Sequence, residues 1–329
     1  MAEQNFSNAG RGTGVMDKSN IEFIHSKPVP RPGRWISAII VFVIASMGVS
    51  AVVTNEKFDW YVVWQWLFSQ RVMMGVMFTL ILTVLAMVFG TILAVTMAIM
   101  RQSLNPVLRG VSWFYIWFFR GTPIYTQLIF WSLVPVLYPN LSLGIPFGPE
   151  FVTFETKLYF NTFWMAVVGL SLNEGAYLAE IIRSGLNSVD PGQREAAESL
   201  GMKPGQVMRR IILPQAMRVI IPPLGNETIS MLKTTSLASV IPFILELTFV
   251  TNDKGTQLFK PIPLLLTAAI WYLIITSILM VVQIHLERYF GRGFGSSSKE
   301  TGKKGRFGRK GNGSANNQQT KNLFLDVTP

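Results

Sequence analysis

The chain has 329 residues, of which half are apolar and only 14% are charged, and its mean hydropathy is +0.36. This composition is unusual for a soluble protein of that length and favours a membrane protein. The chain has no cysteine, which excludes disulfides, thiolate metal sites and cysteine nucleophiles. Its two histidines, His25 and His285, are too few and too far apart for a histidine metal cluster.

The first 34 residues are rich in Asn, Ser, Gly and Pro, and end in the stretch PVPRPGR. They show little apolar periodicity, so we expect a disordered tail over 1–34. The first apolar run starts near residue 35 and has no small-residue cleavage site, which argues against a signal peptide. We therefore expect a retained membrane anchor over 35–53.

Apolar runs of about 20 residues can cross a bilayer as helices. Six segments meet this description, and the third and fifth are interrupted by polar residues or proline. The sequence therefore predicts an all-α protein with six transmembrane helices. The six segments are 35–53, 75–100, 111–136, 158–182, 216–241 and 264–285.

Basic residues are unevenly distributed between the segments that connect these spans. With six spans and a cytoplasmic N-terminus, inside segments hold 22 of the 29 Lys and Arg residues and outside loops hold 5. The other two, Arg120 and Lys233, fall within predicted spans. Because cytoplasmic loops carry an excess of Lys and Arg, both termini are predicted to be cytoplasmic.

The third apolar segment is broken by Arg120-Gly121-Thr122-Pro123. The fourth carries Asn173, Glu174 and Tyr177 within about a third of the helix circumference.

Glu174 lies nine residues before Arg183 and hence near the bilayer midplane. A carboxylate there can attract an ammonium group or a cationic side chain, or can form a hydrogen bond to a neighbouring helix. Glu180 and Arg183 are three residues apart at the cytoplasmic end, where we expect a structural ion pair.

A polar, basic insert, EAAESLGMKPGQVMRRIILP, separates the fourth and fifth apolar segments. Good helix formers over 194–200 follow Asp190 and Pro191, which predicts a short helix. Gly201 should end it in a turn with positive φ, and Pro204-Gly205 prevents immediate continuation.

The fifth apolar segment contains Pro222, Pro223 and Gly225, which predict an interrupted helix. Breaks of this kind survive in membranes only where protein or a water-filled path satisfies the freed backbone groups.

A polar stripe follows the predicted break. Charged groups at that depth are costly when they face lipid, so we expect these residues to face the bundle interior, where Glu227 and Lys233 can pair. Two interpretations remain open: polar packing within or between subunits, and the lining of a translocation path. The stripe consists of Asn226, Ser230 and Lys233, with Glu227 and Thr234 beside it.

The segment 291–329 is rich in Gly, Ser and basic residues and is predicted to be a disordered cytoplasmic tail. Contact with anionic membrane lipid is the expected role of its basic cluster at 303–310. No nucleic-acid partner is expected, because no binding module or aromatic interleaving accompanies the charge.

Several of these segments together resemble a known family. Glu195-Ala196-Ala197, Gly201 three residues later, and Ile211-x-Leu213-Pro214 after nine more match the EAA loop of bacterial ABC importer permeases. The stretches RGTPIYTQL, AYLAEIIR and LPQAMRVIIPPLGNETISMLKTTSL are similar to the polar amino-acid branch of that family. The resemblance covers roughly residues 70–290, with the EAA loop at 190–214.

The resemblance implies a type I importer core of five helices in the bacterial cytoplasmic membrane, to which the span at 35–53 is an N-terminal addition. The sequence departs from the branch at Thr234, where Asp or Asn is common, which puts a charge-specific role there in doubt. It also departs at Asn173-Glu174-Gly175, where the branch often has Ser before Ala-Tyr; this difference can tune the substrate. Arg120 either neutralises a substrate carboxylate or, as we favour, snorkels to the headgroups or packs.

The resemblance further implies a permease subunit that translocates a polar amino acid and is not itself an enzyme. Its coupling residues are Glu195, Ala196, Ala197 and Gly201. Its expected partners are a cytoplasmic ABC ATPase dimer, a second permease of the same or a sister chain, and an extracytoplasmic amino-acid-binding protein. No Gly-x4-Gly-Lys-Ser/Thr phosphate loop occurs, so ATP and Mg²⁺ are used by the partner ATPase and this chain binds no cofactor.

The path residues we expect from the two polar sets are Asn173, Glu174, Tyr177, Asn226, Glu227, Ser230 and Lys233. An ion-coupled secondary amino-acid transporter would also place Glu174 and Lys233 in mid-membrane, but it would not need a coupling loop. A membrane-anchored scaffold would explain the basic tail but not the polar stripes.

Overall fold

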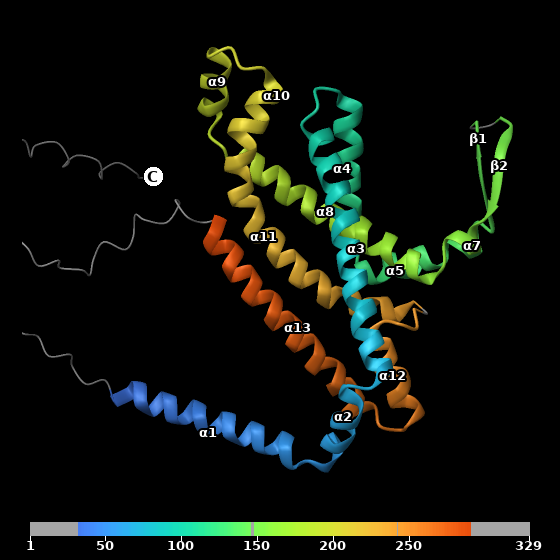
Figure 1. Cartoon of the computed structure of the whole chain (residues 1–329), viewed down its shortest axis with the longest axis vertical. Helices are drawn as coiled ribbons and strands as arrows, with labels where there is room; N and C mark the ends of the chain where they lie inside the picture. Colours follow the sequence, from blue (N-terminus) through green and yellow to red (C-terminus); the bar gives the residue numbers. More distant parts are fainter. Residues whose placement is uncertain (1–31, 146–147, 242, 291–329) are drawn as a thin grey trace, which may run out of the picture. The chain divides into compact units, whose positions relative to one another are not determined.

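A computed structural model of the chain describes residues 32–145, 148–241 and 243–290 (Figure 1). The predicted tail over 291–329, and the predicted tail over 1–34 except its last three residues, lie outside the described residues. The chain divides into two compact units, Met1–Asp59 and Trp60–Pro329, and each is described by itself.

The first unit contains one long helix, α1 (Pro32–Thr54), where the sequence predicts a helix over 35–53. Its described side chains are exposed within this chain, including the large apolar ones such as Trp35. A short 3₁₀ turn, η2 (Glu56–Phe58), follows it and is capped by the Asn55 side chain. A helix with apolar side chains all round suits contact with lipid.

The second unit is mostly helical. Its helices are α2 (Trp60–Leu67), α3 (Gln70–Arg101), α4 (Pro106–Gly121), α5 (Ile124–Ser132), α6 (Val134–Leu137), α7 (Thr156–Tyr159), α8 (Thr162–Asn187), α9 (Pro191–Ser199), α10 (Pro204–Val207), η3 (Met208–Ile212), α11 (Leu213–Thr234), η4 (Thr235–Val240), α12 (Leu247–Gln257) and α13 (Pro261–Phe290). Its two strands are β1 (Asn140–Gly144) and β2 (Glu150–Glu155).

Four helices of the described chain are long and apolar enough to cross a membrane: α1 from Gly33 onward, α3, α8 and α13. They lie where the first, second, fourth and sixth spans are predicted. The third predicted span is divided: α4 ends at Gly121, Thr122 is extended, and α5 begins at Ile124. This division agrees with the predicted interruption.

The fifth predicted span corrects the sequence analysis. α11 continues as a helix through Pro222 and Pro223, so the predicted break at these residues is wrong. Both prolines lack the N–H groups that would bond to the carbonyls of Arg218 and Val219. Such helices are tolerated in membrane proteins, where neighbouring groups satisfy the freed carbonyls. The helical ladder ends only at Thr234, where η4 begins.

Two further elements were not predicted. An antiparallel hairpin of β1 and β2 lies between α6 and α8, and its register pairs Asn140 with Glu155. α12 lies between η4 and α13; its polar sequence gives no apolar stripe, and the side chain of its N-cap residue Glu246 fixes its start.

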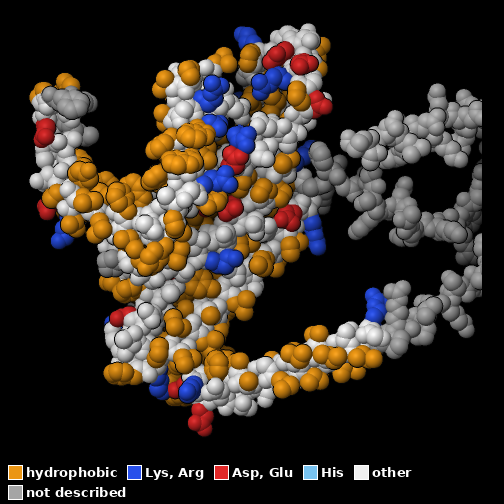
Figure 2. All heavy atoms as spheres, turned by 180° about the vertical axis from the view of Figure 1, so that it is seen from behind, with side chains coloured by type: hydrophobic (Ala, Val, Ile, Leu, Met, Phe, Trp, Pro, Cys, Tyr) orange, Lys and Arg blue, Asp and Glu red, His pale blue; other side chains and the backbone are white. Residues whose placement is uncertain are grey.

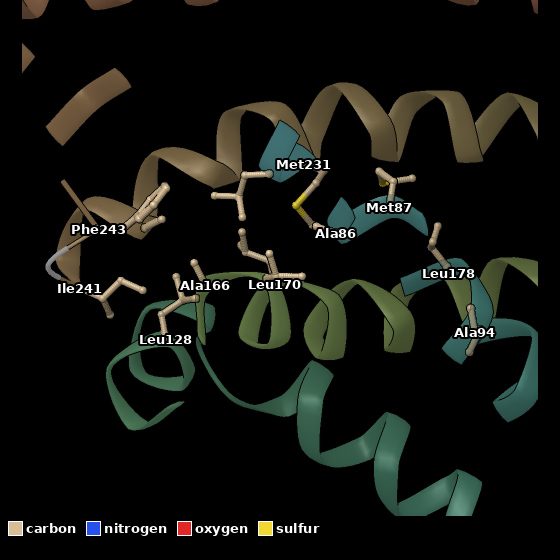
Figure 3. Packing of buried hydrophobic residues seen from close by; sticks show 14 of the residues in the cluster. Ala86, Met87, Ala94, Leu128, Ala166, Leu170, Leu178, Met231, Ile241 and Phe243 are labelled. Atoms are coloured by element: carbon tan, nitrogen blue, oxygen red, sulfur yellow. The ribbon is translucent and has the colours of Figure 1, made fainter. Parts of the chain in front are cut away.

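The main core lies where α3 packs along α8, with α5, α11 and the segment after η4 closing around them. Figure 3 shows side chains from these elements pointing toward one another, among them Leu128, Leu170 and Met231. α3 and α8 approach closely at Gly90, where an added Cβ would lie 3.2 Å from the Cβ of Glu174. A small residue at that point lets two membrane helices pack backbone to backbone.

A second cluster of contacts centres on Glu246, which is fully buried. Its carboxylate accepts hydrogen bonds from the backbone N–H groups of Thr248 (2.7 Å) and Phe249 (3.1 Å) at the start of α12. It also accepts from the Thr79 hydroxyl of α3 at 3.2 Å and from the Tyr272 hydroxyl of α13. One side chain thus ties together three helices, and the buried carboxylate is satisfied on both oxygens.

Candidate functional site: a coupling loop and two polar helix faces

The loop between α8 and α11 begins with α9. Asp190 caps it by accepting a hydrogen bond from the Gly192 N–H at 2.7 Å. At its end, Gly201 has a φ of 79°, and the Met202 N–H bonds back to the Ala197 carbonyl at 3.2 Å. This is a Schellman turn, in which glycine carries the left-handed residue. The short helix and its positive-φ stop were both predicted.

The four predicted coupling residues divide into two groups. Glu195, Ala196 and Gly201 lie on the surface of the loop. Ala197 is buried and packs with Val207 of α10 and Ile212 of η3 in a small apolar core that belongs to the loop itself. The loop therefore holds its own shape and presents its polar face outward.

The loop continues directly into α11. In Figure 1, α10 leads into α11 through η3, a π-helical turn in which the Leu213 N–H bonds to the Met208 carbonyl. The Gln215 side chain donates to the Ile211 carbonyl at 3.0 Å, beside Pro214. π-turns are frequent at functional positions, and this one keeps the loop and α11 on one helical path. The loop and α11 are therefore joined by one continuous helical segment.

The polar residues of α8 point in different directions. Asn173 is buried, and its amide donates to the Phe119 carbonyl at 3.0 Å and to the Gln127 side chain at 3.2 Å. Gln127 in turn donates to Thr122, so the two amides satisfy carbonyls freed where α4 gives way to α5. These contacts give Asn173 a packing role.

Glu174 faces the junction of α3, α8 and α11. Its side chain is 4% exposed, and no described residue forms a hydrogen bond with its Oε1 atom. The half-buried Glu227 of α11 lies near enough to interact electrostatically with it. Two carboxylates from different helices therefore interact electrostatically, and the Glu174 Oε1 atom has no hydrogen-bond partner among the described residues.

The stripe on α11 lies on one continuous helix. Asn226 and Lys233 are exposed within this chain, and Ser230 is half-buried. The expected pairing of Glu227 with Lys233 is not found among the described residues, whereas Arg183 and Glu180 do form an ion pair. The expected pair of Glu180 and Arg183 is thereby confirmed. In this single chain the stripe faces outward, toward space that a second subunit or an aqueous path can occupy.

Tyr177 and Arg120 meet on the open side of α8. The Arg120 guanidinium lies 5.3 Å from the centroid of the Tyr177 ring, a cation–π geometry. Both line a cavity of 550 Å³ between α4 and α8, together with residues that sequence reasoning did not single out, such as Arg101. Figure 2, seen from behind, shows Lys, Arg and carboxylate side chains lying close together amid apolar ones on the visible face.

Two contributors were missed in the sequence. Gln127 carries a signal, because it stands in the RGTPIYTQL stretch, but its bond to Asn173 joins residues 46 positions apart. Arg101 ends α3 and has no motif around it, so only the packing of α3 against α4 reveals that it lines the cavity.

Several known proteins are similar in sequence to this chain. The family described as "Binding-protein-dependent transport system inner membrane component" matches residues 90–292. The arginine transport system permease protein ArgU of Corynebacterium glutamicum is 47% identical over 287 residues, 87% of this chain and 88% of that protein. The L-cystine transport system permease protein TcyB of Bacillus subtilis is 38% identical over 219 residues, 66% of this chain and 86% of that protein.

Solved structures show the same fold. A chain from the crystal structure of an amino acid ABC transporter with histidines is 33% identical, with a TM-score of 0.57 over 67% of this chain and 94% of that one. A chain of the MetNI methionine ABC transporter in an inward-facing conformation is 16% identical, with a TM-score of 0.54 over 68% of this chain and 99% of that one. The second likeness concerns the fold alone.

Proposed function

Because this chain belongs to the family of binding-protein-dependent transport system inner membrane components, as an amino-acid ABC importer permease, we propose that it carries an amino acid with a cationic side chain into the cell. It is a non-catalytic, multi-pass subunit of the cytoplasmic membrane, as its family is. ATP hydrolysis on partner subunits drives the transport.

The observation that carries the substrate class is the pair of Glu174 and Glu227. An ionised carboxylate in the membrane is costly unless it is paired, and two neighbouring carboxylates repel each other. A guanidinium or ammonium group between α8 and α11 relieves both costs, and guanidinium groups bind carboxylates through two parallel hydrogen bonds. The 47% identical relative named for arginine transport supports the same class.

The coupling loop supports ATP drive. Glu195, Ala196 and Gly201 form the exposed surface for a cytoplasmic ABC ATPase dimer, which binds ATP and Mg²⁺. Ala197 keeps that surface rigid from within. Glu227 lies 15 residues beyond Ile212 along the same helical path, a rise of about 23 Å. Movement of the loop is thus transmitted to the acidic pair along one continuous helix, as an alternating-access mechanism requires.

The remaining parts of the assembly follow from the outward polar stripe. A second permease, the same or a sister chain, covers the face with Asn226, Ser230 and Lys233. An extracytoplasmic amino-acid-binding protein delivers the substrate. The permease domain comprises residues 70–290. The helix at 35–53 is an added membrane anchor, and the basic cluster at 303–310, outside the described residues, contacts anionic lipid.

Uptake in proteoliposomes tests this function. The permease is reconstituted with its ATPase and binding protein, and labelled amino acids with cationic, neutral and acidic side chains are compared with and without ATP. We expect ATP-dependent accumulation of the cationic ones that persists after sodium and proton gradients are collapsed. Uptake that needs an ion gradient and no ATP would establish the secondary-transporter alternative instead.

A charge-neutralising variant tests the site within the same assay. Glu227→Gln should raise the half-saturating concentration of cationic amino acids by about tenfold, the effect of 1.4 kcal/mol. Glu150→Gln, on the exposed strand β2, is the matched control and should change nothing. Equal uptake of cationic and neutral amino acids by the unmodified protein would contradict the proposed class.

The orientation can be tested independently, since the natural chain has no cysteine. Both termini and the turn after α3 are proposed to be cytoplasmic. Single cysteines at Leu104, which is 99% exposed, and at Lys157, on the opposite side, should differ in intact cells. An impermeant thiol reagent should label only position 157, and labelling of 104 alone would invert the topology.

A further inference from the structure

The cavity between α4 and α8 contains charge that the proposed acidic pair does not use. Its 550 Å³ are lined on α4 by Trp113, Trp117 and Arg120, at spacings of four and three residues, which place them on one face of the helix. The facing wall is provided by Tyr177, Glu180 and Arg183 of α8. Arg101 closes the end at the α3–α4 turn. We call this cavity the arginine groove.

The groove carries an excess of positive charge. Glu180 is paired with Arg183, and its carboxylate also experiences the charges of Arg101 and Arg120. Among the described residues, neither of these two arginines forms an ion pair. The Arg101 guanidinium reaches only the Arg109 carbonyl, at 3.4 Å, and Arg120 lies over the Tyr177 ring. Two guanidinium groups thus remain available for an anion.

The depth of Arg120 indicates what the groove faces. It lies 11 residues beyond Arg109 along α4, a rise of about 16 Å. Half of a bilayer's hydrocarbon core is about 15 Å, so its Cα lies near mid-membrane if Arg109 marks the cytoplasmic boundary. An exposed guanidinium at that depth is costly against lipid and is typical of a water-filled interior. The groove therefore faces the translocation path.

The groove follows the acidic pair along α8, on the side of the helix that faces α4. Tyr177 is three residues beyond Glu174 on α8, a rise of about 4.5 Å toward the cytoplasmic end. Along this helix a carboxylate is therefore followed by guanidinium groups. An amino acid with a cationic side chain carries its charges in the complementary arrangement: a cation at one end and an α-carboxylate at the other.

We propose that the arginine groove binds the α-carboxylate of the transported amino acid, on the cytoplasmic side of Glu174 and Glu227. This inference rests on the proposed function and adds a second substrate-binding site along the translocation path. Arg120 supplies a charge-assisted hydrogen bond to the carboxylate, and Arg101 adds positive charge at the end of the groove. The stacked rings of Trp113 and Trp117, with centroids 6.0 Å apart, form an apolar wall that strengthens the interaction by excluding water. The groove repels the cationic side chain, which favours its release toward the cytoplasm.

Binding measurements with two probes test this assignment. The permease–ATPase complex in lipid nanodiscs is titrated with L-arginine and with L-argininamide, which lacks the carboxylate. Tryptophan emission reports binding, and the Trp113→Phe/Trp117→Phe variant shows which part of the signal comes from the groove. We expect L-arginine to bind about tenfold more tightly than the amide, as a charge-assisted bond worth about 1.4 kcal/mol implies.

Variants then separate the groove from the rest of the path. Arg120→Gln should weaken L-arginine binding about tenfold and remove the preference over the amide, whereas Arg120→Lys, which keeps the charge, should preserve part of it. Arg109→Gln, on the same helix but outside the lining, should leave binding unchanged. The amount of assembled complex is measured for each variant, and Arg101→Gln provides a second reading if Arg120→Gln does not assemble.

An Arg120→Gln or Arg101→Gln complex that still prefers the acid over the amide by the original factor overturns the groove assignment. So does an emission change on binding that keeps its full amplitude after both groove tryptophans are replaced. Uptake by the unmodified protein separates this failure from a failure of the proposed function. If the unmodified protein imports cationic amino acids while the groove variants bind L-arginine as the wild type does, only the groove assignment is wrong. If the unmodified protein imports no cationic amino acid, both proposals are wrong.

Discussion

The coupling loop and the polar residues inside the membrane are both unusual stretches of this sequence, yet they fold on different principles. The loop is closed by contacts within about 25 residues: the Asp190 cap, the Gly201 turn and the apolar core around Ala197. The membrane residues are fixed by partners far away in the chain, such as Asn173 on the Phe119 carbonyl, 54 positions earlier. The shape of the loop can therefore be predicted from its own sequence. The role of an isolated polar residue becomes apparent only from its contacts in the folded protein.

This difference also separates two kinds of function. The loop has an exposed polar face and continues directly into α11. The membrane residues divide into a satisfied packing group, Asn173 with Gln127, and a group with unused charge, Glu174 with Glu227. Variants in the loop should affect energy coupling, and variants in the second group should affect substrate recognition.

The largest expected effect is in the loop. Gly201→Asp should abolish ATP-driven uptake while the permease remains folded in the membrane. A non-glycine residue at a φ of 79° costs roughly 1–2 kcal/mol, and the space around its Cβ is open, so the damage is confined to the turn and the docking surface. Glu195→Lys, which reverses an exposed charge, should act in the same way. Uptake and membrane abundance are measured together.

Gly205 offers the control for this prediction. It lies in the same loop with open space around it, but in helical conformation within α10. Gly205→Asp adds the same charge without the backbone strain and should retain most of the uptake. Wild-type uptake by Gly201→Asp at normal abundance would refute the coupling role of the turn.

A smaller effect is expected in the path. Glu174→Gln and Asn226→Ala should each lower amino-acid transport by about tenfold or change its selectivity, the effect of 1.4 kcal/mol. These substitutions leave the surfaces proposed to bind the ATPase and the binding protein unchanged. Stimulation of the ATPase by loaded binding protein should therefore be largely retained. If the variants fail to assemble, these residues pack rather than line a path; unchanged rate and selectivity would also remove them from it.

The smallest functional effect is expected at Asn173. Asn173→Ala removes two hydrogen bonds and leaves the Gln127 Oε1 atom without its donor, while the Phe119 carbonyl keeps its bond from the Gln127 amide; the loss should cost about 1–3 kcal/mol of stability. Selectivity should stay as in the wild type. Thermal denaturation in detergent measures the loss, with Asn187→Ala, exposed at the end of α8, as the control. A changed substrate preference would place Asn173 in the path after all.

The elements that can be predicted from the sequence are those determined by residues close together in the chain. The lengths of the apolar segments predicted α1, α3, α8 and α13. The RGTP stretch indicated the division between α4 and α5. The spacing of Gly201 after the helix formers indicated the loop turn, because a left-handed stop can be recognised from composition.

The unpredictable parts depend on tertiary contacts. α11 runs through Pro222 and Pro223 because neighbouring helices hold it, although each proline alone favours a break. Glu246 looks like an ordinary polar residue after the fifth span, but it binds Thr79 of α3, 167 positions earlier, and Tyr272 of α13. The arginine groove combines residues from three helices, and the positive-inside pattern explains only the ends where Arg101 and Arg183 lie.

The most direct test measures transport and ATPase activity in the same proteoliposomes for Gly201→Asp and Glu227→Gln. The two-region account predicts opposite patterns. Gly201→Asp should lose both uptake and the ATPase stimulation by loaded binding protein, whereas Glu227→Gln should keep the stimulation and need about tenfold more of a cationic amino acid for half-maximal uptake. If Gly201→Asp retains stimulated ATPase activity, or if Glu227→Gln loses it with the complex assembled, the division between a coupling loop and a substrate path is contradicted.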